Sequence, residues 1–177
     1  HVAIAARMAI SELDLDRVLI VDWDVHHGNG TQDTFWEDGQ VGFLSVHRSP
    51  FYPGTGSFHE IGEGAGMGTT LNFPLRAGHG DREFFAIYGG VVRPVIEEFE
   101  PDLLLVSAGF DMLSVDPLGG MSLTTEGVAE IASELMAACA SLGHTRMVFV
   151  LEGGYDPERL GRGAVAVIRA LAGLEAP

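Results

Sequence analysis

Residues 18–30, with the sequence VLIVDWDVHHGNG, constrain the fold more than any other part of the chain. The stretch opens with four apolar, mostly β-branched residues, which predict a buried strand running on to Asp24. Because side chains alternate along a strand, Asp22, Asp24 and His26 are expected on one side of it. Two carboxylates and an imidazole at the end of a buried strand are costly to desolvate without a partner. A bound cation is therefore expected there.

The remaining sequence alternates predicted helices with predicted strands. Helices are expected at residues 2–13, 31–36, 81–99 (kinked by Gly89, Gly90 and Pro94), 125–142 after an N-cap at Thr124, and 158–171; strands are expected at 41–47, 69–75, 102–108 and 147–151. Residues 48–68 form a long irregular segment, which in a compact domain is usually functional. The alternation predicts an α/β fold with a mainly parallel sheet covered by helices on both faces. Residues 1–177 are expected to form a single domain.

The charge of the chain excludes some classes of partner. The formal net charge is −15, and the 10 lysines and arginines are scattered. Nucleic-acid surfaces need clustered positive charge, so no nucleic-acid partner is expected, whereas a cationic substrate such as a basic protein tail is favoured. A single cysteine, Cys139, excludes an internal disulfide. No apolar run approaches the roughly 20 residues of a membrane span, so a cytoplasmic protein without a membrane partner is expected.

Three of the predicted strands end in polar or glycine-rich turns, DWDVHHGNG, SAGFD and LEGGY. The carboxyl ends of parallel strands lie at one edge of the sheet, where ligands bind in such folds. Asp24, His26, Asp111 and Tyr155 are therefore expected to converge. A zinc ion held by one histidine and two aspartates keeps a coordination position open for catalysis. The alternative interpretation is a set of turn aspartates and core histidines without a metal.

These motifs, taken together with YPGTG and DPLGG, resemble the zinc-dependent histone deacetylase family. That family includes bacterial acetoin-utilisation and acetylpolyamine amidohydrolase relatives. The motifs occur in the family's order over nearly the whole chain. The resemblance implies an arginase-like α/β fold. It also implies that Asp24, His26 and Asp111 bind zinc and that Tyr155 is the catalytic tyrosine, whose hydroxyl hydrogen-bonds the developing oxyanion.

The resemblance also assigns residues to the substrate channel. Tyr52 and Leu118 match positions that line the acyl-lysine channel, and Gly153 and Gly154 let the backbone approach the substrate. Polyamine-selective relatives can carry an acidic residue at the position of Leu118, so the leucine favours acetyl-lysine over a polyamine.

Cation sites beside the zinc are implied as well. Asp22 and Ser45 match ligands of the family's monovalent cation site, which would hold K⁺. A second such site would use backbone near Phe35, Asp38 and Val41.

His47 and Asn29 are expected to orient other residues of the site without binding the zinc themselves. His47 is expected to brace Ser45. Asn29 and Asp22 match residues that orient a tandem histidine pair, the general base and acid of the family, and asparagine at position 29 resembles class II members. In relatives that pair precedes the helix at residues 2–13, and His1 does not match it by position. The chain is therefore expected to be N-terminally incomplete and inactive alone.

The function expected from these residues is a zinc amidohydrolase that removes acetyl groups from an acetylated lysine peptide or a small acetylated amine. One alternative is a non-catalytic scaffold of the same fold that binds metal and acylated ligands. Another is a binuclear manganese hydrolase of the arginase type, which needs more acidic and histidine ligands than this sequence offers. The sequence leaves the oligomeric state open.

Overall fold

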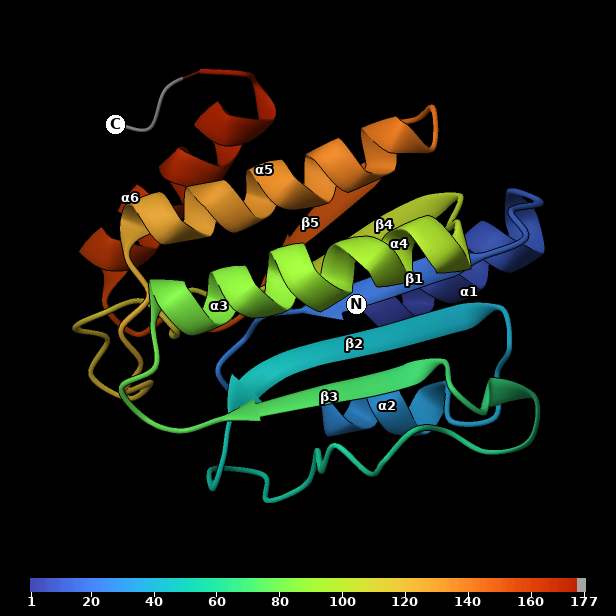
Figure 1. The fold of residues 1–177 in the computed structure, drawn as a ribbon, viewed down its shortest axis with the longest axis horizontal. Coiled ribbons are helices and arrows are strands. Elements are labelled where there is room, and N and C mark those ends of the chain that lie inside the picture. Colours follow the sequence, from blue (N-terminus) through green and yellow to red (C-terminus); the bar gives the residue numbers. More distant parts are fainter. Residues whose placement is uncertain (175–177) are drawn as a thin grey trace.

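A parallel β-sheet forms the centre of the computed structural model, which describes residues 1–174 (Figure 1). Its strands are β1 (Val18–Asp22), β2 (Val41–Arg48), β3 (Thr70–Leu75), β4 (Leu103–Ala108) and β5 (Met147–Leu151). They lie in the order β3-β2-β1-β4-β5, and every neighbouring pair is parallel. The predicted α/β class and parallel sheet are confirmed.

Helices cover both faces of this sheet. They are α1 (Val2–Glu12), α2 (Asn29–Thr34), α3 (Asp81–Ile87), α4 (Arg93–Phe99), α5 (Thr125–Ser141) and α6 (Pro157–Leu171), with a 3₁₀ turn at Gly64–Gly66 and a π-helical turn at Tyr88–Val92. Helices α3 to α6 lie on one face and α1 and α2 on the other (Figure 1). No helix within residues 1–174 is both long enough and apolar enough to cross a membrane.

The side chains of β1 show why its sequence is apolar without interruption. Leu19 and Val21 belong to the large core cluster under α3 to α6, whereas Val18 and Ile20 pack in the smaller cluster under α1. A strand that is buried on both faces cannot alternate polar and apolar residues. Since β1 also pairs with β2 and β4, its carboxyl end lies in the middle of the sheet edge.

The first strand ends two residues earlier than its sequence predicts. Oδ1 of Asp22 accepts a hydrogen bond from the backbone N–H of Asp24 (3.0 Å), and Oδ1 of Asp24 accepts one from the N–H of His26 (2.9 Å). Aspartates that bond the backbone two residues onward turn the chain. The two carboxylates therefore bend residues 22–26 out of the extended conformation.

Other predicted elements agree with the structure to within a few residues. Thr124 caps α5, since its Oγ1 accepts from the N–H of Gly127 at 2.9 Å. The kink predicted in residues 81–99 is the π-helical turn, which contains Gly89 and Gly90. Pro74 lies within β3, which tolerates a proline because β3 is an edge strand.

Candidate metal site

Asp24, His26 and Asp111 meet at the carboxyl edge of the sheet. Asp24 and His26 follow β1, and Asp111 follows β4, the neighbouring strand. One potential ligand atom from each side chain lies within 4.8 Å of the others. Nδ1 of His26 is 2.9 Å from Oδ1 of Asp24 and 3.3 Å from Oδ2 of Asp111. The structure thus brings these three predicted residues together.

The surroundings of Asp111 show that a cation fits between these groups. Its side chain is fully buried, and Oδ1 accepts a hydrogen bond from the N–H of Val25 (2.8 Å). Oδ2 is buried as well and accepts no hydrogen bond. Burial, followed by the charge of Asp24, raises the pKa of Asp111 to about 7. An imidazole and two carboxylates are a donor set that zinc accepts, and a cation would stabilise both carboxylates.

Gly153 brings the turn after β5 against the same carboxylates. Its N–H donates to Oδ2 of Asp24 at 2.8 Å, and its carbonyl accepts from the N–H of Phe110 at 2.8 Å. A Cβ at position 153 would overlap the carboxylate oxygens of both Asp24 and Asp111. Gly154, the next residue, has φ +138°, a conformation that other residues rarely adopt.

A cavity of about 380 Å³ opens above these groups. Its lining consists of Asp22, Asp24, His26, His27, Gly28, Thr31, Tyr52, Ser107, Glu152, Gly153 and Tyr155. Several predicted site residues lie outside this lining. Leu118 is half exposed in a neighbouring loop, Asn29 is exposed at the start of α2, and Ser45 and His47 are buried in β2.

Aromatic rings surround His26 at the mouth of the cavity. Phe51 stacks on its imidazole with 5.1 Å between ring centroids, while Tyr52 and Tyr155 approach edge-on at 6.1 and 6.4 Å. Partial burial, and then the charge of Asp111, raises the pKa of Tyr155 above its ordinary value. Its hydroxyl therefore remains protonated at neutral pH and can donate a hydrogen bond.

Asp22 and Ser45 lie side by side on the neighbouring strands β1 and β2. They are paired in the register of β1 and β2, and both are buried. Burial and the nearby charge of Asp24 raise the pKa of Asp22 well above its usual range. A buried carboxylate with a second carboxylate beside it is a reasonable place for a further cation.

Two buried histidines hold the turn and the irregular segment together. Nδ1 of His47 lies 2.9 Å from Oγ of Ser45, which is the bracing contact expected from the sequence. Nδ1 of His27 lies 2.8 Å from Oγ1 of Thr55, and Nε2 lies 3.0 Å from Oε1 of Gln32. Burial lowers the pKa of both imidazoles, that of His47 to about 4. They are neutral at pH 7, and both ring nitrogens of His27 are occupied.

Sequence reasoning missed Ser107 and Glu152, which line the cavity. Both belong to motifs already recognised, Ser107 as the first residue of SAGFD and Glu152 as the second of LEGGY. Ser107 is paired with Asp22 in the register of β1 and β4, and its Oγ lies 3.5 Å from Oε1 of Glu152. Predicting Ser107 requires the strand pairing, because the pairing of β1 with β4 decides which residue lies beside Asp22.

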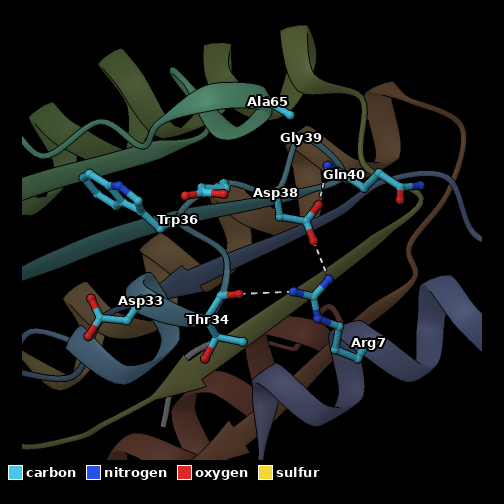
Figure 2. A pocket seen from close by; sticks show the side chains of 9 residues that line it. Arg7, Asp33, Thr34, Trp36, Asp38, Gly39, Gln40 and Ala65 are labelled. Atoms are coloured by element: carbon cyan, nitrogen blue, oxygen red, sulfur yellow. Dashed lines mark hydrogen bonds and ion pairs between the residues drawn. The ribbon is translucent and has the colours of Figure 1, made fainter.

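A larger cavity of about 720 Å³ lies elsewhere, between α1 and the segment joining α2 to β2. Figure 2 shows that the guanidinium of Arg7 points across it to Asp38 and to the carbonyl of Thr34. Oγ1 of Thr69 donates to the carbonyl of Asp38 at 3.2 Å. The side chain of Asp38 is thus paired with a cation of the chain itself, whereas the second cation site expected here would use backbone groups.

Comparisons with known proteins agree with this geometry. A family model described as "Histone deacetylase domain" matches residues 1–171. "Histone deacetylase 10, chloroplastic" of Oryza sativa subsp. japonica is 45% identical over 98% of this chain and 39% of its own length. A "Probable deacetylase" of Archaeoglobus fulgidus is 41% identical over 90% of this chain and 45% of its own length. The chain therefore spans less than half of the length of these relatives.

A solved structure shows the same arrangement of elements. The "Structure of the histone deacetylase Clr3" superposes with a TM-score of 0.92 and 41% identity, covering 99% of this chain and 30% of that one.

Proposed function

The chain belongs to the histone deacetylase family, and we propose that it carries the metal-binding part of a single amidohydrolase domain that removes acetyl groups from acetylated lysine side chains or similar acetylated amines. The observation that carries this proposal is the convergence of Asp24, His26 and the buried Asp111, the first two of which line one cavity with Tyr155. The net charge of −15 favours a cationic substrate such as a basic peptide.

We assign the Zn²⁺ ligands to Asp24, His26 and Asp111. The assignment is supported by the buried Oδ2 of Asp111, which accepts no hydrogen bond, and by His26 Nδ1, which faces both carboxylates. A zinc ion held there would supply Lewis-acid polarisation of the amide carbonyl. Gly153 keeps the carboxylates accessible, because any side chain at that position would fill the space beside them.

Tyr155 is assigned to the carbonyl oxygen of the substrate. Its hydroxyl is a protonated donor beside His26, and it would hydrogen-bond that oxygen as negative charge develops on it. A donor aimed at a developing oxyanion contributes roughly 10²–10³-fold to kcat.

Tyr52 on the wall of the cavity and Leu118 in the neighbouring loop are assigned to substrate binding. Tyr52 is strongly exposed at the mouth and offers an aromatic surface to an acyl-lysine side chain. Leu118, with its apolar side chain half exposed, adds no charge to attract a second amine, which favours acetyl-lysine over a polyamine. Asp22 and Ser45 are assigned to K⁺, on the basis of their burial and pairing.

Neither histidine of the cavity, His26 or His27, is free to act as the general base or acid. His26 directs Nδ1 at the two carboxylates, and both nitrogens of His27 are hydrogen-bonded. General acid–base help typically contributes 10²–10⁴-fold. The 177-residue chain alone is therefore expected to bind zinc but to hydrolyse slowly or not at all, and turnover is expected only from a protein that adds the family's tandem histidine pair.

The test compares zinc content and turnover. The complete protein and the 177-residue chain are loaded with zinc, and each is assayed on an acetyl-lysine peptide, with Tyr155→Phe as the variant. The proposal expects one zinc per chain in all samples, turnover by the complete protein, and a 10²–10³-fold lower kcat in Tyr155→Phe. Zinc binding without turnover by the complete protein would instead identify a non-catalytic scaffold.

A further inference from the structure

Asp116, in the loop after β4, hydrogen-bonds both to its own loop and to the backbone of Tyr155. It lies in residues 112–120, and only 8% of it is exposed. Oδ1 accepts hydrogen bonds from the backbone N–H of Leu118 (2.8 Å) and of Gly119 (2.9 Å). Oδ2 accepts one from the N–H of Tyr155 (2.8 Å). One buried carboxylate therefore satisfies three backbone donors from two distant segments.

The bond to Asp116 is the anchor nearest to the ring of Tyr155. Two earlier residues of this turn are fixed by other contacts: Glu152 donates its N–H to the carbonyl of Ala108, and Gly153 donates to Asp24. Gly154, which comes next, has no side chain to fix the direction of the chain. The ring of Tyr155 is 49% exposed, so packing restrains it only partly. The bond from the Tyr155 N–H to Asp116 is the contact that holds the backbone of this residue before the cap of α6 at Asp156.

The loop that carries Asp116 is held against the metal site. A Cβ on Gly119 would overlap the carbonyl oxygen of Asp111, so the loop lies directly on that residue. Nη1 of Arg48 donates to the carbonyl of Gly119 at 3.1 Å, and its guanidinium lies 4.2 Å above the centre of the Phe51 ring. Asp116 is thus a fixed reference point relative to Asp111.

We propose that Asp116 is a positioning residue, which sets the ring of Tyr155 relative to Asp24, His26 and Asp111 through its bond to the Tyr155 N–H, while its other oxygen holds the loop at Leu118. The inference rests on the proposed function of Tyr155. Asp116 itself does not touch the reacting atoms.

The sharpest variant is Asp116→Asn in the complete protein. The amide oxygen can still accept from Leu118 and Gly119, but the amide nitrogen then faces the N–H of Tyr155, and two donors cannot bond. The matched control is Asp102→Asn. Oδ2 of Asp102 also accepts from two backbone donors, the N–H groups of Asp16 (2.9 Å) and Arg17 (3.1 Å), but it lies at the opposite end of β4.

Kinetics and a spectroscopic signal are measured together. The proposal expects Asp116→Asn to lower kcat about 10–100-fold with KM changed less than about threefold, because ground-state binding is retained while the oxyanion donor is displaced. In protein labelled with 3-fluorotyrosine, the ¹⁹F resonance that disappears in Tyr155→Phe is expected to shift or broaden in Asp116→Asn. Asp102→Asn is expected to leave both kcat and this resonance unchanged.

Each other result decides against the inference. An unchanged Tyr155 resonance in Asp116→Asn, or an equal loss of kcat in Asp102→Asn, means that Asp116 only stabilises the fold. If the unmodified complete protein has no turnover, the proposed function fails separately, and the ¹⁹F resonance alone then decides whether Asp116 positions Tyr155.

Discussion

The backbone N–H of Gly153 donates a 2.8 Å hydrogen bond to Oδ2 of Asp24, across 129 residues of sequence. The carbonyl of the same glycine accepts from the N–H of Phe110. The turns after β1, β4 and β5 therefore form one connected unit.

Gly153→Ala is expected to abolish zinc binding. The new Cβ would overlap carboxylate oxygens of Asp24 and Asp111, so one of these side chains must move. We expect the affinity for zinc to fall at least about 100-fold, measured by competition with a chelating dye. Gly161→Ala in α6 is the control, because a Cβ there meets no atom within 4 Å. It should bind zinc normally and add about 0.5–1 kcal/mol of helix stability. Normal zinc affinity in Gly153→Ala would contradict the assigned ligands.

Asp111→Asn is expected to weaken zinc binding without lowering the stability of the metal-free protein. Asparagine keeps an oxygen for the N–H of Val25 but removes the charge beside Asp24. Without metal, the variant should melt no lower than the parent. The rise in Tm on adding zinc should shrink, because the stabilisation that a ligand gives at a fixed concentration falls as its Kd rises. A zinc-induced rise equal to that of the parent would exclude Asp111 as a ligand.

Glu60→Gln is expected to loosen the irregular segment that carries Tyr52. The carboxylate of Glu60 accepts from Nε2 of Gln32 (2.7 Å) and from the N–H groups of Gly56 and Ser57 (both 3.1 Å). An amide nitrogen in place of one oxygen leaves a donor facing a donor, which destabilises by about 1–3 kcal/mol.

Urea unfolding measures this loss of stability, and amide hydrogen exchange should rise in residues 51–60. In the complete enzyme KM should increase more than kcat falls. The exposed Glu63 of the same segment supplies the control, since Glu63→Gln should change none of these quantities. Equal exchange rates in the two variants would refute the anchoring role of Glu60.

Cys139 is expected to make the fold sensitive to alkali. Burial raises the pKa of its thiol from 9.0 to about 11. Between pH 9 and pH 11 the unfolded chain loses this proton and the folded chain keeps it, so the free energy of unfolding falls as pH rises. Cys139→Ala should flatten that part of the stability curve. At pH 8 the folded thiol should react with a maleimide far more slowly than the denatured one, and equal rates would show that Cys139 is accessible.

The convergence of Asp24, His26 and Asp111 could be predicted from the sequence because each residue sits where an apolar run meets a polar turn. Strand periodicity and the rule for parallel sheets bring such turns together without knowledge of any contact. The end of β1 was predicted two residues too late, because the aspartates that suggest a metal also bend the backbone.

The pairing of strands and the hydrogen bonds of buried carboxylates leave no recognisable pattern in the amino-acid sequence. Ser107 stands beside Asp22 only through the register of β1 with β4. Asp116 reaches Tyr155 across 39 residues through a backbone group that every amino acid except proline possesses. Residues that act through main-chain bonds of this kind become visible only once the fold is known.

The strand order has a consequence for the assembly of the site during synthesis. β1 lies between β2 and β4, so the chain makes the middle strand of the sheet before both of its neighbours, and β4 follows β1 by about 80 residues of sequence. Val25, which lies between Asp24 and His26, is hydrogen-bonded to a partner 86 residues further along the chain, Asp111. Long-range pairings of this kind form late in folding. A nascent chain thus carries two of the three groups well before the third, and under the proposed ligand assignment firm retention of zinc would report that β4 has docked.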